Sequence, residues 1–423
     1  MLGLGWFACH WGRMKKKTKS QPKRSDITLL NQLCNMIPPH LASKLALETD
    51  VEKQWRSFSP WSHSVAMMHG QVAHSVGLND LCDALELHRG PLSAIRGATP
   101  PSRNNLSNAN RGRSAVFAEK LFWQTYAHWQ RSCPGFGGGR QDGRFIRRFR
   151  TAIHLVDSSV IELVASCMSW AKHRRRKAAA KLHLKLTLQS FLPDFAIIDT
   201  ARQSDSKRAR ELCAGISEGE IVIFDKAYVD FDHLGDLHRR GVCWVTRAKS
   251  NLAYGVYRKL PNADRRVLRD EVICLKHPSA SAPEYLRRVV AVVEINGQKR
   301  EMVFLTSNLE WSPWSVAELY RCRWDIEVFF KQIKQTLQLA DFFGQSANAV
   351  RWQIWSALLV YLLLRVQAFL NRWQPSFNRL VTLIRSALWL KLDLLSLLHY
   401  YGTAGVRQRF RAVPEQAYLP GFA

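Results

Sequence analysis

The spacing of apolar positions changes once along the chain. Over residues 25–86 apolar residues recur at three- and four-residue steps, and proline turns interrupt the pattern at 38–39 and 59–60. Steps of this size place side chains on one face of a helix, and proline ends a helix or begins the next one. We therefore expect a series of short helices in the first part of the chain.

A segment rich in Pro, Asn, Ser and Arg follows at residues 90–113. Its centre, 99–107, predicts a turn that leads into a helix whose first turn carries Arg103. Polar side chains at such a position can reach phosphates or base edges, as in helix-turn-helix proteins. An ordinary capped helix start has the same composition. The residues alone do not separate the two interpretations.

A glycine-rich break at 135–139 marks a domain boundary between about 135 and 150. Beyond it, apolar runs and period-two alternation predict strands at 152–156, 181–188, 195–198, 221–224 and 242–245. The alternation at 181–188 is typical of a half-solvated strand. Helical spacing between the strands predicts helices at 204–214 and 231–240. Strands and helices in this order favour a mixed α/β sheet.

Residues 250–310 interrupt the α/β pattern with further strands. Asn296-Gly297, between apolar runs at 288–295 and 301–306, predicts a two-residue hairpin turn, and we interpret the whole stretch as an inserted β-rich subdomain. Helical spacing returns at 315–340 and 347–370. The most apolar part of the last helix, 354–364, is shorter than the roughly 20 residues that span a bilayer, which favours a buried helix.

The charge of the chain indicates its partner. The sequence has 61 Lys+Arg against 34 Asp+Glu, a formal net charge of +27 over 423 residues. Such an excess favours a polyanion such as nucleic acid, because bound phosphates release their counterions. A soluble basic protein with no such partner is the plain alternative. With 47% hydrophobic residues, a disordered or fibrous chain is excluded.

Cysteines and the first residues bear on the compartment. The nine cysteines are scattered singly, without a CxxC pair or histidines at zinc spacing, which is typical of a reduced cytoplasmic chain. An apolar opening at 1–11 precedes the basic run at 15–17, the reverse of the order in a secretory signal. We expect no membrane association and a basic extension over residues 1–24.

Two aspartates stand at the ends of apolar strands. Period-two alternation places Asp157 on the same strand face as Leu155, and Asp225 on the same face as Ile223. A carboxylate there is costly unless it meets a cation, water or a helix terminus, and α/β sheets carry their sites at strand ends. A solvated loop acid at each position is the alternative.

A third carboxylate lies on a predicted helix, 314–339. Steps of about 100° per residue place Tyr320, Arg323, Glu327 and Lys334 on one arc roughly 60° wide, next to the apolar face. The alternative is a solvated helix face, since ion pairs at i and i+4 are common there. Three carboxylates in a basic chain suit Mg²⁺ or Mn²⁺ and in-line phosphoryl transfer, with Arg323 and Lys334 on the phosphate oxygens.

The same residues carry a family resemblance. The spacing Tyr320-x2-Arg323-x3-Glu327-x6-Lys334 resembles the Tyr-Arg-Glu-Lys pattern of DDE transposases of bacterial insertion sequences, the insertion sequence four family. The segments HLVDSSVIEL around Asp157 and IVIFDKAYVDF around Asp225 are similar to the family's two aspartate motifs. Further likeness extends over nearly the whole chain after residue 25. Lys226 departs from the pattern, because the family commonly has Arg after the second aspartate.

The resemblance implies an RNase H-like catalytic core interrupted by a β-rich insertion, with a helical N-terminal DNA-binding domain and a helical C-terminal region. The implied divisions are 1–24, 25–140, 150–249, 250–310, 311–370 and 371–423. It also implies a metal-binding catalytic triad of Asp157, Asp225 and Glu327 holding Mg²⁺, for which Mn²⁺ can substitute. The implied DNA- and phosphate-binding residues are Tyr320, Arg323, Lys334, Trp324, Arg247, Lys249 and Arg103.

The implied activity is cut-and-paste transposition in the cytoplasm. The enzyme would cleave DNA at the terminal inverted repeats with water as the nucleophile, and would join the freed 3′-hydroxyl to target DNA as a homodimer in a synaptic complex. Two other functions remain open from the sequence. One is a catalytically inactive or domesticated copy that only binds DNA, and the other is a host RNase H-like nuclease.

Overall fold

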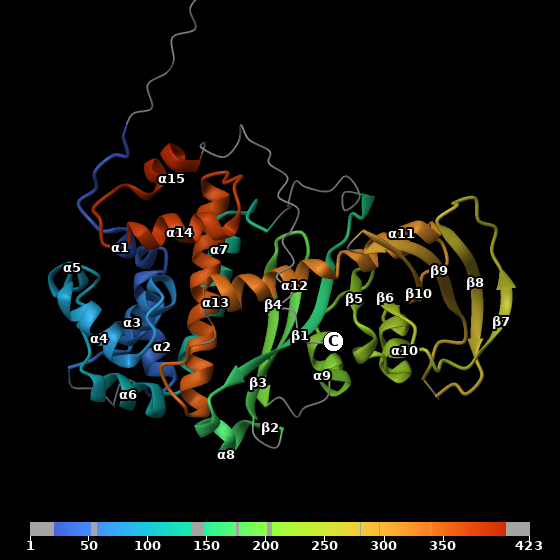
Figure 1. Ribbon diagram of the computed structural model, residues 1–423, viewed down its shortest axis with the longest axis horizontal. Coiled ribbons are helices and arrows are strands. Elements are labelled where there is room, and N and C mark those ends of the chain that lie inside the picture. The colour runs from blue at the N-terminus through green and yellow to red at the C-terminus, as the bar shows by residue number, and fades with distance from the viewer. Residues whose placement is uncertain are drawn as a thin grey trace, which may run out of the picture.

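The computed structural model describes residues 21–51, 57–137, 148–174, 177–200, 205–279, 281–295, 297–337, 339 and 341–402. Figure 1 shows an elongated molecule, with helices from both ends of the chain at one side and a long sheet from the middle to the other side. The basic extension predicted at 1–24 lies mostly outside the described residues, and so does residue 403 onward.

The first part of the chain is helical, as predicted. Its elements are α1 (Leu29–Asn35), α2 (Pro39–Glu48), α3 (Pro60–Ala73), α4 (Leu78–Leu87), α5 (Arg89–Ser93), α6 (Arg103–Gly112) and α7 (Val116–Ser132). The predicted proline breaks are the starts of α2 and α3. Proline is tolerated there because the first amides of a helix have no hydrogen-bond partner within the helix. Ser102 caps α6 by accepting a hydrogen bond from the Asn105 amide, 3.2 Å away.

Ten strands of the described chain form one mixed sheet. They are β1 (Ile153–Leu163), β2 (Lys172–Arg174), β3 (Lys177–Thr187), β4 (Leu192–Thr200), β5 (Ile221–Phe224), β6 (Cys243–Arg247), β7 (Tyr254–Lys259), β8 (Val267–Leu275), β9 (Leu286–Ile295) and β10 (Gln298–Thr306). Strands β4, β3 and β1 are antiparallel neighbours, and β5 and β6 continue from β1 in parallel. This arrangement confirms the predicted mixed α/β sheet.

The β-rich stretch extends the same sheet. Strand β10 pairs antiparallel with β6, and β9, β8 and β7 follow in order to the free edge. The predicted hairpin is confirmed by the pairing of Gln298 with Ile295 across a two-residue turn. Gly297 in that turn has a φ of 74°, a backbone conformation that glycine adopts without strain.

Further helices follow β1 in the chain, and some of them cover the two faces of the sheet. They are α8 (Met168–Ala171), α9 (Asp205–Leu212), α10 (Phe231–Arg239), α11 (Pro313–Arg321), α12 (Trp324–Lys331), α13 (Ala347–Leu370), α14 (Phe377–Ser386) and α15 (Leu394–Gly402). Leu155 and Ile223 belong to the larger apolar core, which includes residues of α12 and α13. Val156 and Phe224 point to the opposite face and pack in a core with residues of α9 and α10.

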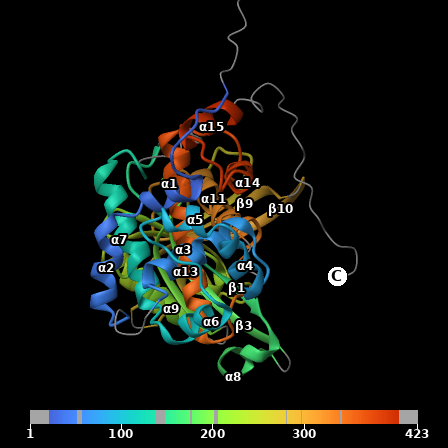
Figure 2. The same cartoon turned by 90° about the vertical axis from the view of Figure 1, so that its left-hand side faces the viewer.

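Helix α13 joins the two halves of the molecule. By length and composition it could cross a membrane, but 78% of its apolar window is buried inside the protein, as predicted for a core helix. It packs against α3 and α7, and Figure 2 shows it between the surrounding N-terminal helices. The Asn348 side chain donates hydrogen bonds to the carbonyls of Asn110 and Arg113, and Trp352 donates a third to Arg113. The N-terminal helices are thus fixed to the core through the end of α6.

Two predictions of local structure were wrong. The helix expected at 314–339 is not continuous, because α11 and α12 are separated at Cys322-Arg323 and a π-helical turn follows at Gln332–Thr336. The strand at 181–188 is not half-solvated. His183 is fully buried and Lys185 is 4% exposed, because α9 and its carboxylates cover the polar face of β3. Period-two alternation correctly assigned the polar and apolar side chains of β3 to opposite faces of the sheet. It could not show that α9 covers the polar face.

Candidate active site

Two strand ends bring the aspartates together. Val156 and Phe224 are paired across the parallel strands β1 and β5. Asp157 follows Val156 in the sequence, and Asp225 follows Phe224. Neighbouring parallel strands end at one edge of the sheet, so both carboxylates meet there. Both point to the face that α12 covers, as the alternation predicts. Strand β1 continues to Leu163, whereas Asp225 begins a 3₁₀ turn at Lys226–Tyr228.

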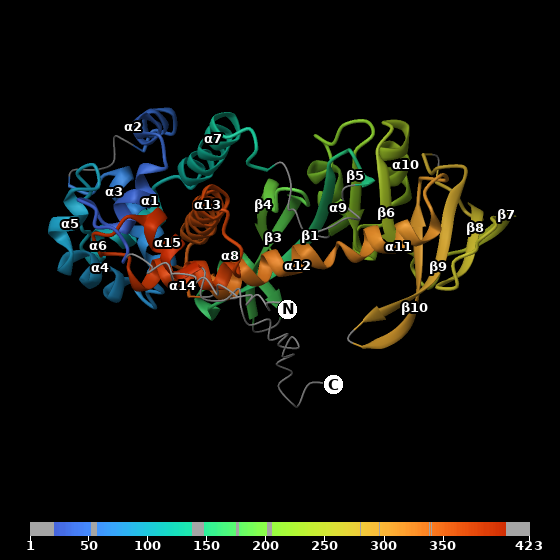
Figure 3. The same ribbon diagram turned by 90° about the horizontal axis from the view of Figure 1, so that it is seen from above.

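The junction between α11 and α12 carries the third group of side chains. The Arg323 amide donates to the Tyr320 carbonyl, and the Ile326 amide donates to the Arg323 carbonyl, at 3.0 and 3.1 Å. These i to i+3 hydrogen bonds tighten the turn, as in a 3₁₀ segment. Figure 3 shows α11 and α12 as successive helices along the side of the sheet. Tyr320, Arg323 and Glu327 consequently approach the strand ends from one short segment.

Hydrogen bonds link this segment to both aspartates. Tyr320 Oη donates to Asp225 Oδ1 over 3.1 Å. Arg323 donates from Nη1 to Asp157 Oδ2 over 2.9 Å and from Nη2 to Glu327 Oε1 over 2.6 Å. One guanidinium therefore bridges two carboxylates contributed by a strand and a helix. Charge-assisted bonds of this kind are about twice as strong as neutral ones.

The electrostatics show that the carboxylates interact. The pKa of Asp157 is raised from 3.8 to about 6, chiefly by burial, and the charges of Asp225 and Glu327 also raise it. The Ser158 amide and Arg323 oppose this shift. Asp157 and Arg323 have side chains only 17% and 13% exposed, whereas Glu327 is 39% exposed. A buried acid beside two other acids favours the arrival of further positive charge.

Tyr320 and Arg323 remain protonated in this environment. Burial raises the pKa of the Tyr320 phenol, and so does the Asp225 carboxylate. For Arg323, burial lowers the pKa, but the carboxylates of Asp157 and Glu327 raise it and the net shift is upward. Tyr320 is thus a hydrogen-bond donor and Arg323 a fixed cation over the physiological pH range.

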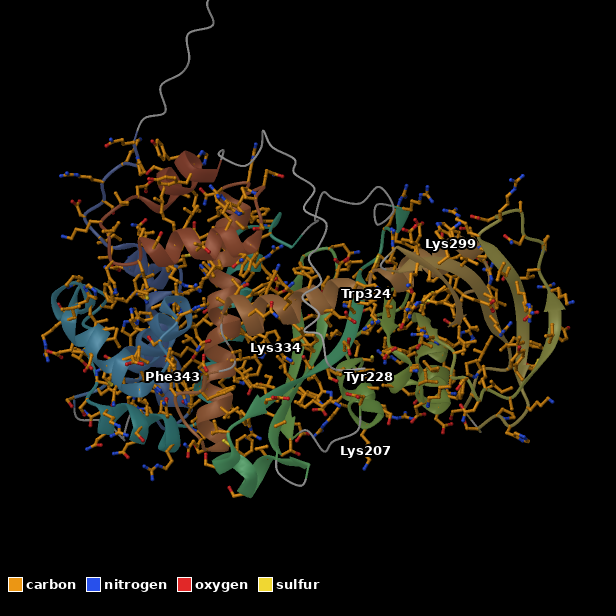
Figure 4. All side chains as sticks on the ribbon, viewed as in Figure 1. Lys207, Tyr228, Lys299, Trp324, Lys334 and Phe343 are labelled. Atoms are coloured by element: carbon orange, nitrogen blue, oxygen red, sulfur yellow. The ribbon has the colours of Figure 1, made fainter. Side chains whose placement is uncertain are left out.

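A basic cavity of about 690 Å³ opens beside the acids, between the β9–β10 hairpin and the α11–α12 segment. Its charged and aromatic lining residues are Arg247, Arg265, Arg266, Lys299, Arg321, Arg323, Glu318, Glu294, Phe304, Trp314, Tyr320 and Trp324. Trp324 is 46% exposed, and the Arg323 guanidinium lies 5.6 Å from its ring centroid. Figure 4 shows Lys299, Trp324 and Lys334 following one another across the middle of the molecule.

The structure places most of the predicted site residues near the acids. Lys249 and Arg103 lie apart from them. Arg247 ends β6 beside β5 and lines the basic cavity. Lys334 Nζ donates to the Val160 carbonyl, three residues beyond Asp157 on β1. Lys249 donates to the Val229 carbonyl over 3.1 Å and lines a separate hollow. Arg103 lies exposed on α6, beside another hollow of about 650 Å³ that the loop 342–346 closes.

Sequence reasoning missed a group of partly buried residues behind the aspartates. Ser158 Oγ donates to Asp205 Oδ1 over 2.7 Å, and Lys181 Nζ lies 2.8 Å from the same oxygen. Tyr228, three residues after Asp225, is 1% exposed. The Lys-x-His-x-Lys alternation of β3 was the available signal, because basic residues on a covered face require acidic partners.

The oxygen donors suit a divalent ion, although the carboxylates are held apart by Arg323. No group of three His, Cys, Asp or Glu side chains in the described ranges stands close enough to hold a metal. The donors of Asp157, Asp225 and Glu327 are nevertheless hard oxygen ligands of the kind that Mg²⁺ and Mn²⁺ prefer. The bridging guanidinium supplies positive charge where such an ion would be needed. Asp157, Asp225 and Glu327 would therefore hold a divalent ion only if Arg323 released its carboxylate partners.

Comparison with protein families identifies two regions. Residues 148–363, about half of the chain, match the family model described as Transposase DDE domain. This region contains the two strand ends and the α11–α12 segment. Residues 25–95 match a domain of unknown function (DUF4372), which covers α1 to α5.

Named relatives agree with the family match. A transposase-named protein of Sinorhizobium fredii, y4zB, is 30% identical over 303 residues, which cover 70% of this chain and 80% of the relative. A protein of Geobacillus stearothermophilus named as a transposase for insertion sequence element IS5377 is 26% identical. The match covers 53% of this chain and 59% of the relative. Transposase InsG for element IS4 of Escherichia coli is 25% identical, covering 44% and 43%.

One solved structure resembles the chain loosely. It is a piggyBac transposase synaptic complex with hairpin DNA, at 10% identity and a TM-score of 0.43, and the match covers 88% of this chain and 83% of that one.

Proposed function

The chain belongs to the DDE transposase family, of the kind found in insertion sequence element IS4, and from this premise we propose that it cuts and joins DNA at the terminal inverted repeats of its own element. As a family member it is a DNA-cleaving and DNA-transferring enzyme of an insertion sequence. The residue roles, the DNA sites and the metal mechanism below are the parts of the proposal that require tests.

We assign an RNase H-like fold to the catalytic half. Three antiparallel strands, β4, β3 and β1, lie beside two parallel strands, β5 and β6, and helices α9 and α10 lead into the parallel pair. In this arrangement β1 and β5, the first and fourth strands of the core, are neighbours. Their ends therefore present two acids at one sheet edge. Strands β7 to β10 come between β6 and α11 and correspond to the proposed β-rich insertion.

Asp157, Asp225 and Glu327 are the proposed catalytic carboxylates. Bound between them, divalent metal would activate water or a 3′-hydroxyl and stabilise the leaving oxygen of the phosphodiester. Arg323 would exchange its carboxylates for a nonbridging phosphate oxygen of the transposon end. Tyr320 holds Asp225 through its hydroxyl and so fixes the carboxylate for its role. Lys334, on the other side of Asp157, would contact the adjoining phosphate.

The basic cavity is the proposed path of the DNA strand next to the acids. Arg247, Arg265, Arg266, Lys299 and Arg321 line it, with Glu318 and Glu294 as its acids. Cations at successive positions of a groove neutralise successive phosphates, and exposed aromatic rings such as Trp324 can stack on bases. We place Lys249 at the far end of this DNA path, since it lies on the segment that follows β6.

Helix α6 is the proposed reader of the terminal repeat. Its exposed side chains include Arg103, Asn104, Asn108 and Arg111, and it contains no acid. Asparagine makes paired hydrogen bonds to adenine edges, and arginine at the start of the helix can contact phosphates. Exposed acids of α4, Asp80 among them, would remain outside the duplex contact. Because Asn348 and Trp352 tie α6 to α13, the reader would sit at a fixed distance from the catalytic carboxylates.

The remaining organisation is proposed as the sequence indicates it. We place the DNA-binding domain at 25–140, the core at 150–249 and 311–370, the insertion at 250–310 and a helical region at 371–423. Two copies would bring two transposon ends together in a cytoplasmic synaptic complex, with Mg²⁺ or Mn²⁺ as cofactor. The homodimer is a testable part of the proposal.

One observation carries this function: Arg323 bridges Asp157 and Glu327 while Tyr320 holds Asp225, all at one sheet edge. The test is cleavage of end-labelled DNA with the element's terminal repeats in Mg²⁺. Asp225→Asn should abolish cleavage and retain repeat binding. Asp236→Asn, on α10 in ion pairs with Arg210 and Arg239, is the control and should cleave as the wild type does.

Three other results of this assay would each refute a different part of the proposal. Cleavage by Asp225→Asn would refute the catalytic assignment. Wild-type protein that shifts the repeat DNA without cutting it would be a DNA-binding copy only. Cleavage of unrelated DNA at an equal rate would indicate a general nuclease.

A further inference from the structure

We propose that Asp205 is a positioning residue that sets the orientation of the strand-end aspartate Asp157 through Ser158. The proposal rests on the function proposed above and adds a buried polar group on the opposite face of the sheet. Asp205 is the first residue of α9, and none of the motifs that indicate the acidic site contains it.

Ser158 links Asp205 to the first aspartate. Its amide donates to Asp157 Oδ1 over 2.8 Å, and its hydroxyl donates to Asp205 Oδ1 over 2.7 Å. Successive residues of a strand point to opposite faces, so Ser158 faces α9 when Asp157 faces α12. A bond from the Ser158 side chain to α9 therefore fixes the peptide plane that presents Asp157.

Helix α9 also packs against the turn that follows the second aspartate. Tyr228 closes the 3₁₀ turn that starts at Asp225, and its amide donates to the Asp225 carbonyl over 3.0 Å. Its buried hydroxyl makes no hydrogen bond of normal geometry, and its pKa is raised first by burial and then by the Asp205 charge. The hydrogen-bonded link from Asp205 therefore runs through Ser158 to Asp157.

Lys181 of β3 keeps Asp205 charged. Lys181 Nζ lies 2.8 Å and His183 Nδ1 3.5 Å from Asp205 Oδ1. Burial raises the pKa of Asp205, but Lys181 and the Ser158 hydroxyl lower it more, so the net shift is downward. A charged acceptor holds a hydroxyl more firmly than a neutral one. Asp205 therefore acts as a fixed acceptor behind Asp157.

The same strand face offers a matched control. Lys185 Nζ lies 3.0 Å from Asp194 Oδ2, and the Lys185 side chain is 5% exposed. In the β1–β3 register Lys185 is opposite Val156, one pair before Asp157, whereas His183 is opposite Ser158. Asp194 reaches His154 and Lys185 but has no hydrogen bond to Ser158 or Tyr228. Loss of Asp194 removes a comparable ion pair and leaves the hydrogen bonds of Ser158 to Asp157 and Asp205 intact.

The experiment compares full-length Asp205→Asn, Ser158→Ala, Ser158→Thr and Asp194→Asn with the wild type. Three properties are measured: affinity for terminal-repeat DNA, Mn²⁺ binding from the EPR signal of free Mn²⁺ with DNA present, and the Mn²⁺ dependence of cleavage. Partners that orient metal ligands typically contribute about 10- to 100-fold to metal affinity or activity. We expect Asp205→Asn and Ser158→Ala to lose about that much, with unchanged DNA affinity.

Ser158→Thr keeps the hydroxyl and should restore most of the Mn²⁺ affinity, and Asp194→Asn should lower only the melting temperature. Wild-type Mn²⁺ binding by both Asp205→Asn and Ser158→Ala would overturn the proposal, as would an equal loss in Asp194→Asn. Ser158→Ala leaves the Asp205–Lys181 pair intact and tests the idea if Asp205→Asn does not fold. Absence of cleavage by the wild type would instead refute the proposed function.

Discussion

The guanidinium of Arg323 is bound to Asp157, with Nη1 2.9 Å from Oδ2, although the two residues are 166 positions apart in the chain. Because the other guanidinium nitrogen holds Glu327, the single charge of this arginine is shared between the carboxylates of Asp157 and Glu327. An arginine in this place stabilises the metal-free site. In the proposed mechanism it would have to leave the carboxylates before they could hold a divalent ion.

Removal of this arginine should make the protein depend on divalent ions for stability. In EDTA we expect Arg323→Ala to be destabilised by up to about 3 kcal/mol, at the low end for a broken buried pair because Glu327 is 39% exposed. Added Mg²⁺ should then raise the melting temperature of the variant more than that of the wild type. Thermal unfolding over a Mg²⁺ titration measures both effects.

Arg321→Ala is the control for this experiment. Arg321 lines the same cavity, its side chain is 72% exposed, and its ion pair with Glu318 is 3.9 Å long. This variant should respond to Mg²⁺ as the wild type does. Equal Mg²⁺ responses in Arg323→Ala and the wild type would show that the guanidinium and the ion do not compete.

The raised pKa of Asp157 predicts a pH-dependent stability of the metal-free protein. With a folded-state pKa of about 6 against an ordinary 3.8, the native state binds more protons than the unfolded state between these values. Stability from this group is therefore lost as the pH rises from about 4 to about 6, by roughly 2 to 3 kcal/mol. Asp157→Asn should be more stable than the wild type at pH 8 and similar at pH 4.

Buried histidines oppose this trend, so the comparison must be between variants. Burial lowers the pKa of His183 and of His233 to about 4, and their stability contribution is lost as the pH falls from about 6.5 toward 4. Denaturant unfolding of both proteins in EDTA at several pH values isolates Asp157. A difference between them that does not change with pH would contradict the assignment.

Helix α6 should separate affinity from base recognition. Arg103→Ala should weaken binding to all DNA sequences and reduce the salt slope of binding by about one. Asn104→Ala should instead lower discrimination at one base pair by about 1 to 3 kcal/mol. Arg131→Ala, at the exposed end of α7, should change neither. Gel-shift titrations at several salt concentrations measure these effects.

The fixed attachment of α6 predicts where the DNA is cut. Extra base pairs inserted between the terminal repeat and the end of the element should move the cleavage position with the repeat. Cleavage that stays at the original end of the element would show that α6 does not set the distance.

A buried ion pair in the proposed insertion should contribute strongly to stability. Arg287 and Asp270 form two hydrogen bonds, with side chains 4% and 1% exposed, and Arg287 also donates to the carbonyls of Leu309 and Trp311. Arg287→Met would leave Asp270 charged and uncompensated, at a cost of about 3 to 5 kcal/mol. Arg287→Met combined with Asp270→Leu should cost less. Urea unfolding of the three proteins tests this expectation.

The sequence by itself determined the residues of the acidic site and the faces they occupy. Alternation along β1 and β5 is a property of the extended backbone, so Asp157 and Asp225 could be assigned to one face without knowledge of the fold. The spacing from Tyr320 to Lys334 indicated the family, because spacing is local information. Helical periodicity likewise predicted α13 as a buried helix.

Tertiary structure decided what these local patterns meet. The break between α11 and α12 arises where the segment must reach both strand ends, and a 100° step per residue could not predict it. Burial of the polar face of β3 depends on α9, whose carboxylate at Asp205 is distant from Lys181 in sequence. Backbone geometry fixes the direction of a side chain, but its partners come from long-range pairing, which only the folded chain defines.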